Sequence, residues 1–346
     1  MVVNTFDKIA VKGLAVAVPS KWVSIESLKT EENSENLERF VKNTGITGHY
    51  FAHERQTASD FCYVAAESIV NKSGIDRKDI GVLVFITQYP DYKTPSTACT
   101  LHFRLGLSNS CIAFDVNLGC SGFTYGMNIV SSLLKLSSSK YGLLLVGDTA
   151  ASTGRQTGNN KLLFGDAGSA VLLAKTSTDD RITICSMTDG SGFKNLWQPN
   201  GFARHRDRPN DKSIHNELNV FNFAINEVPR MINGYFELTG LNSSSYDALV
   251  LHQANLMIIK NIAKRTKFNK DQLLISLDVF SNTSGASIPT ALVKYYGDSD
   301  DDKRLRLMTC GFGVGLSWAL ADITIDTQNI YPLIKTDEYF DDGLFV

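Results

Sequence analysis

One cysteine stands in a setting that suits a nucleophile. Cys120 lies in the segment Asn-Leu-Gly-Cys-Ser-Gly-Phe at 117–123, after a β-rich run and before a run with helical apolar spacing. This pattern predicts a strand–turn–helix with the thiol at the turn, the arrangement of a nucleophile elbow. The unpaired N–H groups of a helix start favour a thiolate, so we expect a lowered pKa for this thiol. The alternative is a buried structural cysteine, and the motif alone leaves both open.

Two further polar residues follow apolar segments in the second half of the chain. His252 ends the run Leu-Val-Leu at 249–251, and polar residues at the carboxyl edge of a strand are where α/β proteins gather their sites. Asn282 begins the segment Asn-Thr-Ser-Gly-Ala-Ser-Ile-Pro at 282–289, where an asparagine can also cap a helix. Taken one at a time, the two residues favour a hydrogen-bonded core histidine and a capping asparagine.

Two glycine-bearing segments lack the spacing of phosphate-binding loops. They are Phe-Gly-Asp-Ala-Gly-Ser-Ala at 164–170 and Cys-Gly-Phe-Gly-Val-Gly at 310–315. The second segment can bring a backbone N–H close to a reacting oxygen. Histidines and cysteines with zinc-ligand spacing are absent from the sequence.

These residues need a scaffold, and the sequence predicts an α/β fold. Residues 8–18 are expected to form the first strand, and the stretch 201–215 is expected to be a polar surface excursion. Helical patterns cover 57–73, 120–136, 217–238 and 256–264. They alternate with strand-like apolar runs, which is typical of α/β architecture; the runs are 81–87, 112–116, 141–146, 169–174, 248–251, 305–309 and 316–323.

An internal repeat of pattern links the two halves of the chain. The run at 79–88 resembles 246–253, and the strand–turn–helix at 114–122 resembles 278–285. The offset of about 165 residues for the best-matched segments predicts two similarly folded halves, 1–176 and 177–346. Equivalent loops of the halves could then meet and share one site.

Composition and charge exclude several classes of function. The 346 residues carry 34 Lys and Arg against 36 Asp and Glu, a net charge of −2, which argues against general nucleic-acid binding. No run approaches the ~20 apolar residues that span a bilayer. The six cysteines form no Cys-x-x-Cys pair, so we expect free thiols and a reducing, cytoplasmic setting.

Together, the motifs resemble one family closely. Cys120 in Gly-Cys-Ser-Gly-Phe, His252 in His-Gln-Ala-Asn, Asn282 in its Asn-Thr-Ser segment, and the segments 164–173 and 311–319 look like the marks of β-ketoacyl-acyl carrier protein synthase III. The separations of 132 residues from Cys to His and 30 from His to Asn are also similar. The resemblance covers essentially the whole chain. It implies the thiolase fold, a duplicated five-layered αβαβα core, and a homodimer.

The resemblance implies a two-step condensation without metal or cofactor. Cys120 would take an acyl group from an acyl thioester, normally acyl-CoA. Malonyl-acyl carrier protein would then lose CO2, and its enolate would attack that acyl group to give a β-ketoacyl-acyl carrier protein. His252 and Asn282 would hold the enolate oxygen with neutral N–H donors, and the N–H groups of Cys120 and Val314 would form an oxyanion hole.

The resemblance also assigns residues that bind substrate. Thr94, Phe312 and Gly313 would line the substrate pocket. Thr94 stands where the family has an aromatic residue that reaches in from the other subunit, so a larger or more polar acyl group would be admitted. Arg39 and Asn43 stand where the well-studied members hold CoA with Trp and Arg.

Docking of the carrier protein is expected on the helix after His252. Met257 replaces the arginine with which the family docks its carrier protein. Lys264 and Arg265 would supply the positive charge on the same helix. Carrier proteins are acidic, so opposite charges would set the association rate.

Two other functions compete with condensation. The first is an acyltransferase of the same fold that moves an acyl group from Cys120 to an O- or N-nucleophile, and such enzymes often lose the histidine or the asparagine. The second is a non-catalytic partner subunit, a role that tolerates loss of the cysteine. Because Cys120, His252 and Asn282 are all present, condensation is favoured.

Overall fold

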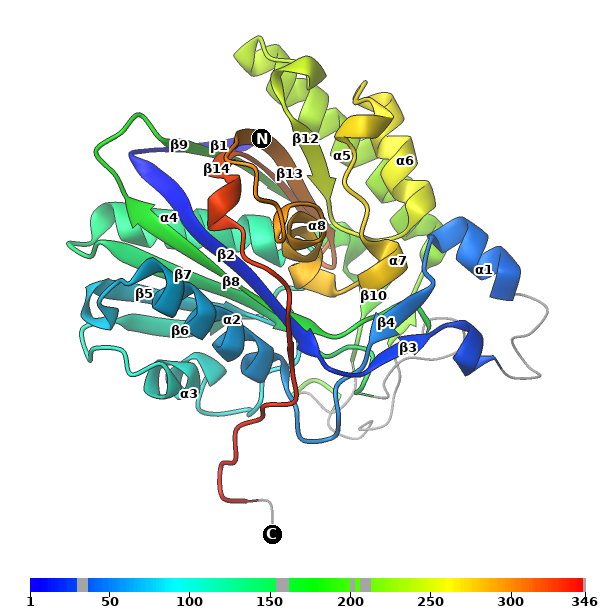
Figure 1. Cartoon of the computed structure of the whole chain (residues 1–346). Helices are drawn as coiled ribbons and strands as arrows, with labels where there is room; N and C mark the ends of the chain where they lie inside the picture. The colour runs from blue at the N-terminus through cyan, green and yellow to red at the C-terminus, as the bar shows by residue number, and fades with distance from the viewer. Residues whose placement is uncertain (30–36, 154–161, 200–202, 206–212, 345–346) are drawn as a thin grey trace.

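The strands form two large sheets that are stacked with helices between and outside them. The computed structural model describes residues 1–29, 37–153, 162–199, 203–205 and 213–344. Within these residues, the large sheets have six and five strands, and two short ribbons lie beside them. The layers follow the order α, β, α, β, α (Figure 1), as the family resemblance implied.

The six-stranded sheet has the order β15-β2-β8-β7-β5-β6. Its central strands are mixed in direction: β5 is parallel to β6 and β7, whereas β8 is antiparallel to β7 and β2. The strands are β2 (Ile9–Pro19), β5 (Ile80–Ile86), β6 (Ile112–Val116), β7 (Tyr141–Asp148), β8 (Ala167–Lys175) and β15 (Ile334–Thr336).

The five-stranded sheet has the order β1-β9-β14-β13-β12. Only β12 and β13 are parallel among its described pairs, and the other neighbours are antiparallel. The strands are β1 (Val2–Asp7), β9 (Arg181–Thr188), β12 (Ala248–Leu251), β13 (Arg304–Gly313) and β14 (Ser317–Asp326).

The helices fill three layers. α4 (Gly122–Leu136) and α8 (Ser287–Tyr296) lie between the sheets and contact strands of both (Figure 1). α2 (Ala58–Ser73) and α3 (Thr97–Arg104) cover the outer face of the six-stranded sheet. α5 (Glu217–Thr239) packs on β13 and β14, and α6 (Leu256–Arg265) packs on α5.

Shorter elements connect these layers. α1 (Leu37–Thr44) contacts α6, and α7 (Leu277–Phe280) contacts the ribbon of β3 (Trp22–Ser24) and β4 (Gly48–Tyr50). A second ribbon pairs β10 (Leu196–Trp197) with β11 (Ile214–His215). Single 3-10 turns lie at Glu26–Leu28, Arg77–Asp79, Gly190–Asn195, Ser243–Ser245, Lys270–Gln272, Ser284–Ala286 and Thr327–Asn329.

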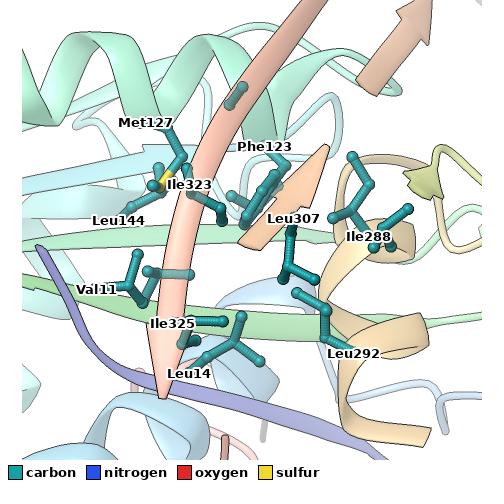
Figure 2. Close-up of a cluster of buried hydrophobic side chains, with 14 of the residues drawn as sticks. Val11, Leu14, Phe123, Met127, Leu144, Ile288, Leu292, Leu307, Ile323 and Ile325 are labelled. Atoms are coloured by element: carbon teal, nitrogen blue, oxygen red, sulfur yellow. The ribbon is translucent and has the colours of Figure 1, made fainter. Parts of the chain in front are cut away.

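Side-chain alternation along the strands explains the layering. On β5, Val82, Val84 and Ile86 join the cluster between the sheets, while Leu83 and Phe85 pack under α2 and α3. Successive strand residues point to opposite faces, so an apolar residue at every position requires a cover on both faces. Figure 2 shows the central cluster, in which both sheets, α4 and α8 converge; its labelled residues are Val11, Leu14, Phe123, Met127, Leu144, Ile288, Leu292, Leu307, Ile323 and Ile325.

Two glycines let α4 lie directly on the six-stranded sheet. A Cβ on Gly122 would come within 2.7 Å of Ile86, and one on Gly126 within 2.4 Å of Leu144. Both distances are shorter than ordinary van der Waals contact, so these positions need glycine for this helix–sheet spacing. The close seat fixes where α4 begins and therefore where the preceding cysteine lies.

The expected strands and helices are confirmed, with differences at the N-terminus. Residues 8–18 correspond to β2 and not to the first strand, because β1 precedes them. β1 was missed because its residues are mostly exposed. β1 joins the sheet of the second half, and β15 joins that of the first, so two strands cross the expected division at 176/177. Much of the expected surface excursion, at 201–202 and 206–212, lies outside the described residues.

The described helices include none that is long and apolar enough to cross a membrane.

Phe123 tests the central layer. Its side chain is 1% exposed, so Phe123→Ala should lower the free energy of unfolding by about 3–5 kcal/mol through lost burial and a cavity. The measurement is denaturant unfolding. Leu136→Ala, at the other end of the same helix and 88% exposed, is the matched control and should change stability by less than about 0.5 kcal/mol. Equal losses in the two variants would contradict the packing described.

Candidate active site

A strand of the five-stranded sheet packs against the turn that carries Cys120. Cys120 lies between the end of β6 and the start of α4, and the Gly122 N–H donates to the Gly119 carbonyl at 2.6 Å. β13 passes so close that a Cβ on Gly313 would lie 2.7 Å from the Cβ of Cys120 and 3.1 Å from its sulfur. A Cβ on Gly311 would lie 2.9 Å from the Cys120 carbonyl oxygen. Glycine at both positions therefore brings the second half of the chain onto the thiol.

Burial of the turn opposes the lowering of the thiol pKa that we expected from the helix start. Burial, together with the charge of Asp148, raises the pKa of Cys120 to about 12. The Ser284 hydroxyl and the backbone N–H groups of Cys120 and Val314 face the sulfur and oppose the shift only in part. The helix start is present as expected, and desolvation is the largest cause of the upward shift. The raised pKa favours the thiol over the thiolate at neutral pH.

His252 is held as a neutral donor. It follows β12, its N–H donates to the Cys310 carbonyl at 2.8 Å, and its ring packs edge-on against Phe312. Nδ1 lies 2.7 Å from the Ser287 hydroxyl oxygen, which itself accepts the Gln253 N–H at 3.3 Å. We expect the Ser287 hydroxyl to donate to Nδ1, which would leave the ring proton on Nε2; the backbone of Ser284 also faces the ring. Burial lowers the pKa of His252 to about 3, so the ring is uncharged at neutral pH.

Asn282 presents its amide nitrogen in the same way. Its backbone forms an isolated β-bridge with the segment 163–165: the Asn282 N–H donates to the Leu163 carbonyl and the Gly165 N–H donates to the Asn282 carbonyl, each at 3.1 Å. Its Oδ1 accepts the Ser284 N–H at 2.9 Å, whereas Nδ2 makes no hydrogen bond within the described chain. This bond closes a local turn and orients the amide; it is not the helix cap considered from sequence, because the 3-10 turn at 284–286 and α8 begin after Thr283 and Ala286 without side-chain caps. Ser281 and Ser284 flank it with φ of 57° and 51°, a backbone conformation that non-glycine residues seldom adopt.

Neighbouring motif residues have structural duties. The Gln253 amide holds the Leu251 carbonyl and the Ser276 N–H, and Asn255 caps α6 by accepting the Ile258 N–H at 2.9 Å. Asp166 accepts the N–H groups of Ala52 and Ala151 at 3.0 and 2.8 Å. Most polar side chains in the motifs around His252 and Phe164 therefore hold the backbone in place through hydrogen bonds.

Asp148 is a site residue that the sequence did not reveal. Its Oδ1 accepts the Thr87 hydroxyl at 2.9 Å and the Gln88 N–H at 2.8 Å, which fixes the end of β5. Oδ2 makes no close hydrogen bond, although Ser284 and Gly285 lie near enough to favour the carboxylate. Burial raises the pKa of Asp148 to about 6. An aspartate at a strand end has no distinct sequence pattern, so only the fold shows its place.

Cys120, His252 and Asn282 open into one cavity of about 800 Å³. Phe312, Gly313 and Val314 line it with them. The size falls within the range of small-molecule sites. The remaining lining residues are Arg39, Phe40, Asn43, Thr44, Gln88, Tyr89, Ala150, Leu163, Phe164, Leu196, Trp197, Gln198, Ser213, His215, Glu217, Leu218, Val220, Phe221, Ala254, Asn255, Met257, Ile258 and Ser284.

The sequence matches known families in the segments that build this cavity. Residues 114–190 match the profile of 3-oxoacyl-[acyl-carrier-protein] synthase III, and residues 236–325 match the profile of its C-terminal part. A β-ketoacyl-[acyl-carrier-protein] synthase III of Escherichia coli is 32% identical over 306 residues, 86% of this chain and 95% of that protein. The chain belongs to the β-ketoacyl-acyl carrier protein synthase III family. It is accordingly a condensing acyltransferase.

Two further comparisons agree with this synthase III family. A putative 3-oxoacyl-[acyl-carrier-protein] synthase 3 of Campylobacter jejuni is 30% identical and covers 96% of this chain and 99% of its own. The crystal structure of a 3-oxoacyl-(acyl-carrier protein) synthase from Burkholderia xenovorans superposes with a TM-score of 0.91 at 31% identity, covering 97% of this chain and 99% of that one. The thiolase fold expected from the sequence is thereby confirmed.

The residues expected to bind substrate in this synthase III homologue divide into two groups. Phe312 and Gly313 line the cavity beside the nucleophile, and Arg39 and Asn43 line it as well. Thr94 is exposed and does not line the cavity of the single chain. Its contribution to a pocket stays a prediction that requires a second subunit.

The expected docking helix carries a different set of charges. Met257 lines the cavity and is 43% exposed, and Lys264 is exposed on α6. Arg265 instead donates to the Ile225 carbonyl and the Asn226 side chain of α5, both at 2.8 Å. Lys260 was overlooked; it lies one turn from Met257 and one from Lys264, on the same helix face.

Groups of three or more His, Cys, Asp or Glu side chains that could hold a metal ion are not found among the described residues.

Ser287 tests how His252 is oriented. With Ser287→Ala, Nδ1 loses its donor, so the proton should redistribute between the two ring nitrogens and condensation should slow about tenfold, the value of one hydrogen bond. Nitrogen-15 NMR of the imidazole at pH 7 measures the tautomer. Thr290→Ala is the matched control, since its hydroxyl bonds only within α8 and towards Thr283. An unchanged tautomer in Ser287→Ala would contradict the assignment.

Proposed function

We propose that Cys120 is acylated by an acyl thioester, with acyl-CoA as the donor. The thiol attacks the thioester carbonyl, the carbon–sulfur bond to CoA breaks, and the thiol proton ends on the CoA sulfur. The Cys120 and Val314 N–H groups stabilise the oxyanion of the tetrahedral intermediate. Both groups face the sulfur, where the attacked carbonyl would lie. Because the thiol pKa is raised, its proton leaves with the attack and not before it.

The second half-reaction uses His252 and Asn282. Malonyl-acyl carrier protein enters, its carboxylate leaves as CO2, and the electron pair of the broken bond forms an enolate. His252 Nε2–H and Asn282 Nδ2–H donate to the enolate oxygen, and the enolate carbon attacks the acyl-cysteine. The products are the β-ketoacyl-acyl carrier protein and the Cys120 thiolate, which takes a proton from water.

One observation supports this proposal above the others: two neutral donors share a cavity with the cysteine, each oriented by its own serine. An acyl transfer to an O- or N-nucleophile would need neither donor, because no enolate forms. A non-catalytic subunit would need no cysteine. The structure keeps all three groups in place, so condensation is the function that accounts for each of them.

We propose a homodimer in which β6 faces β6. β6 is an edge strand with one side unpaired, and such edges are commonly covered by a second chain. Ile112 on β6 is 47% exposed and Phe103 on α3 is 75% exposed. Thr94, near the start of α3, would then approach the partner's cavity.

The reaction as proposed draws on protein groups alone and needs no cofactor. All six cysteines lie within the described residues and are unpaired. Free thiols suit a reducing compartment, so we propose that the reaction takes place in the cytoplasm.

The half-reactions should separate under mutation. Cys120→Ser should abolish acyl transfer to the protein, whereas His252→Ala and Asn282→Ala should still be acylated and should lose about a hundredfold in CO2 release, the cost of one donor to an oxyanion. Intact mass after incubation with acyl-CoA measures the first step. Carbon dioxide from malonyl-acyl carrier protein measures the second. Acylation mapped to Cys111 or Cys310, or near-normal CO2 release in either alanine variant, would contradict the assigned roles.

Carrier-protein docking should depend on the exposed lysines of α6. Lys260→Glu with Lys264→Glu should raise the KM for malonyl-acyl carrier protein about tenfold at low salt, less at high salt, and leave acylation by acyl-CoA unchanged. Arg265 is left intact because it ties α6 to α5. Lys72→Glu with Lys78→Glu, near the end of α2, carries the same charge change as a control. Equal effects of the two pairs would place docking elsewhere.

A further inference from the structure

Gln88 is a polar residue beside the nucleophile to which the mechanism assigns no role. It follows β5, lines the same cavity as Cys120, and is half-buried. A Cβ on Gly119, the residue before the nucleophile, would lie 2.3 Å from Gln88 Oε1 and 2.7 Å from Cδ. The amide of Gln88 therefore occupies the space that a side chain at 119 would fill, directly against the nucleophile turn.

The Gln88 side chain is not needed to hold the fold at this point. Its backbone N–H is already fixed by Asp148 at 2.8 Å, while its side-chain amide makes no hydrogen bond within the described chain. Neither amide atom is among the described polar atoms that are buried without a partner, so the amide is accessible and opens to the cavity. The backbone of Gln88 is therefore fixed, while its side-chain amide has no hydrogen-bond partner among the described residues.

The cavity that this amide lines has both polar and apolar walls, and the Ser284 hydroxyl oxygen would lie 3.2 Å from the same Cβ position on Gly119. Ala150, Leu163, Phe164 and Leu196 line the same cavity. Water can hydrate this accessible amide while the cavity is empty, but an apolar acyl chain that displaced the water would leave the amide without a hydrogen-bond partner. A wall built only for a hydrocarbon chain would be better served by leucine or methionine at this position. The amide has a use if the bound acyl group offers it a hydrogen bond.

A second glutamine supports a polar acyl site. Gln198, beside β10, also lines the cavity, and its Oε1 accepts the Ser213 hydroxyl at 3.3 Å. Its Nε2 is buried without a partner among the described residues. Of the two glutamines, Gln88 lies against the nucleophile turn, so an acyl group on Cys120 would have its first carbons nearer to Gln88.

We propose that Gln88 is a specificity-determining residue that selects an acyl group with a hydroxyl close to its thioester carbonyl, a 3-hydroxyacyl group. The carboxamide can both donate to and accept from an alcohol. A site that hydrogen-bonds a substrate hydroxyl discriminates strongly against the analogue that lacks it. The inference rests on the proposed acylation of Cys120 and names the class of its donor.

The test compares butyryl with (R)- and (S)-3-hydroxybutyryl donors, each offered as the CoA and as the acyl carrier protein thioester. Single-turnover acylation is followed by intact mass. The wild-type protein should take one 3-hydroxybutyryl enantiomer at least tenfold faster than butyryl. Gln88→Met, which keeps the length of the side chain and removes its hydrogen bonds, should reduce that preference about tenfold by slowing the hydroxylated donor alone.

Two controls separate specificity from folding. The butyryl rate of Gln88→Met should stay within about twofold of wild type, and Gln88→Leu is a second apolar replacement if the methionine variant is unstable. Gln328→Met makes the same substitution at an exposed position outside the cavity and should leave every rate unchanged.

The possible failures are distinguishable. A wild-type preference for butyryl, or an equal preference in wild type and Gln88→Met, overturns the inference and leaves the proposed condensation standing. Loss of CO2 release from pre-acylated Gln88→Met with either acyl group would assign Gln88 to the malonyl substrate and also overturns it. A wild-type protein that accepts no acyl group from any of the six thioesters contradicts the proposed function itself.

Discussion

The site depends on one constraint: the turn that carries Cys120 is packed tightly between the two sheets. Gly122 and Gly126 lower α4 onto one sheet, and Gly311 and Gly313 bring β13 of the other sheet against Cys120. Both sets of contacts need the missing Cβ. The result is a reactive group enclosed by protein on most sides, and the ionisation of every nearby group follows from that enclosure.

Burial of the site favours the uncharged forms of its ionisable side chains. Burial favours the thiol form of Cys120 and the uncharged imidazole of His252 at neutral pH. The side chains of His252 and Asn282 are oriented by hydrogen bonds with Ser287 and Ser284, respectively. In surroundings of low polarity such donors stabilise a developing oxyanion more than they would in water. An imidazolium would instead pay the cost of desolvation before any enolate formed.

The fold could be predicted from the sequence because it depends on local patterns, and the motifs also singled out Cys120, His252 and Asn282, which line one cavity in the structure. Continuous apolar runs such as 80–86 are typical of buried strands, and the combined motifs around Cys120, His252 and Asn282 are specific to one family. The thiol pKa could not be predicted from the helix start, because desolvation comes from Gly311 and Gly313, about 190 positions away in the sequence. The tie between Arg265 and α5 was hidden for the same reason: it is a contact between segments 40 residues apart.

Chemistry and selectivity come from different parts of this scaffold. The donors follow β12 and precede α8, where Ser287 and Ser284 fix them, whereas the acyl side of the cavity is bordered by the end of β5, which Asp148 fixes through Thr87 and Gln88. Under the proposed mechanism, a change at Gln88 would alter which acyl group the cavity accepts without displacing His252 or Asn282. Among the described residues the two sets of contacts meet at Ser284, which holds Asn282 and lies near Asp148. The proposed specificity of the acyl group could therefore change with little effect on the proposed condensation step.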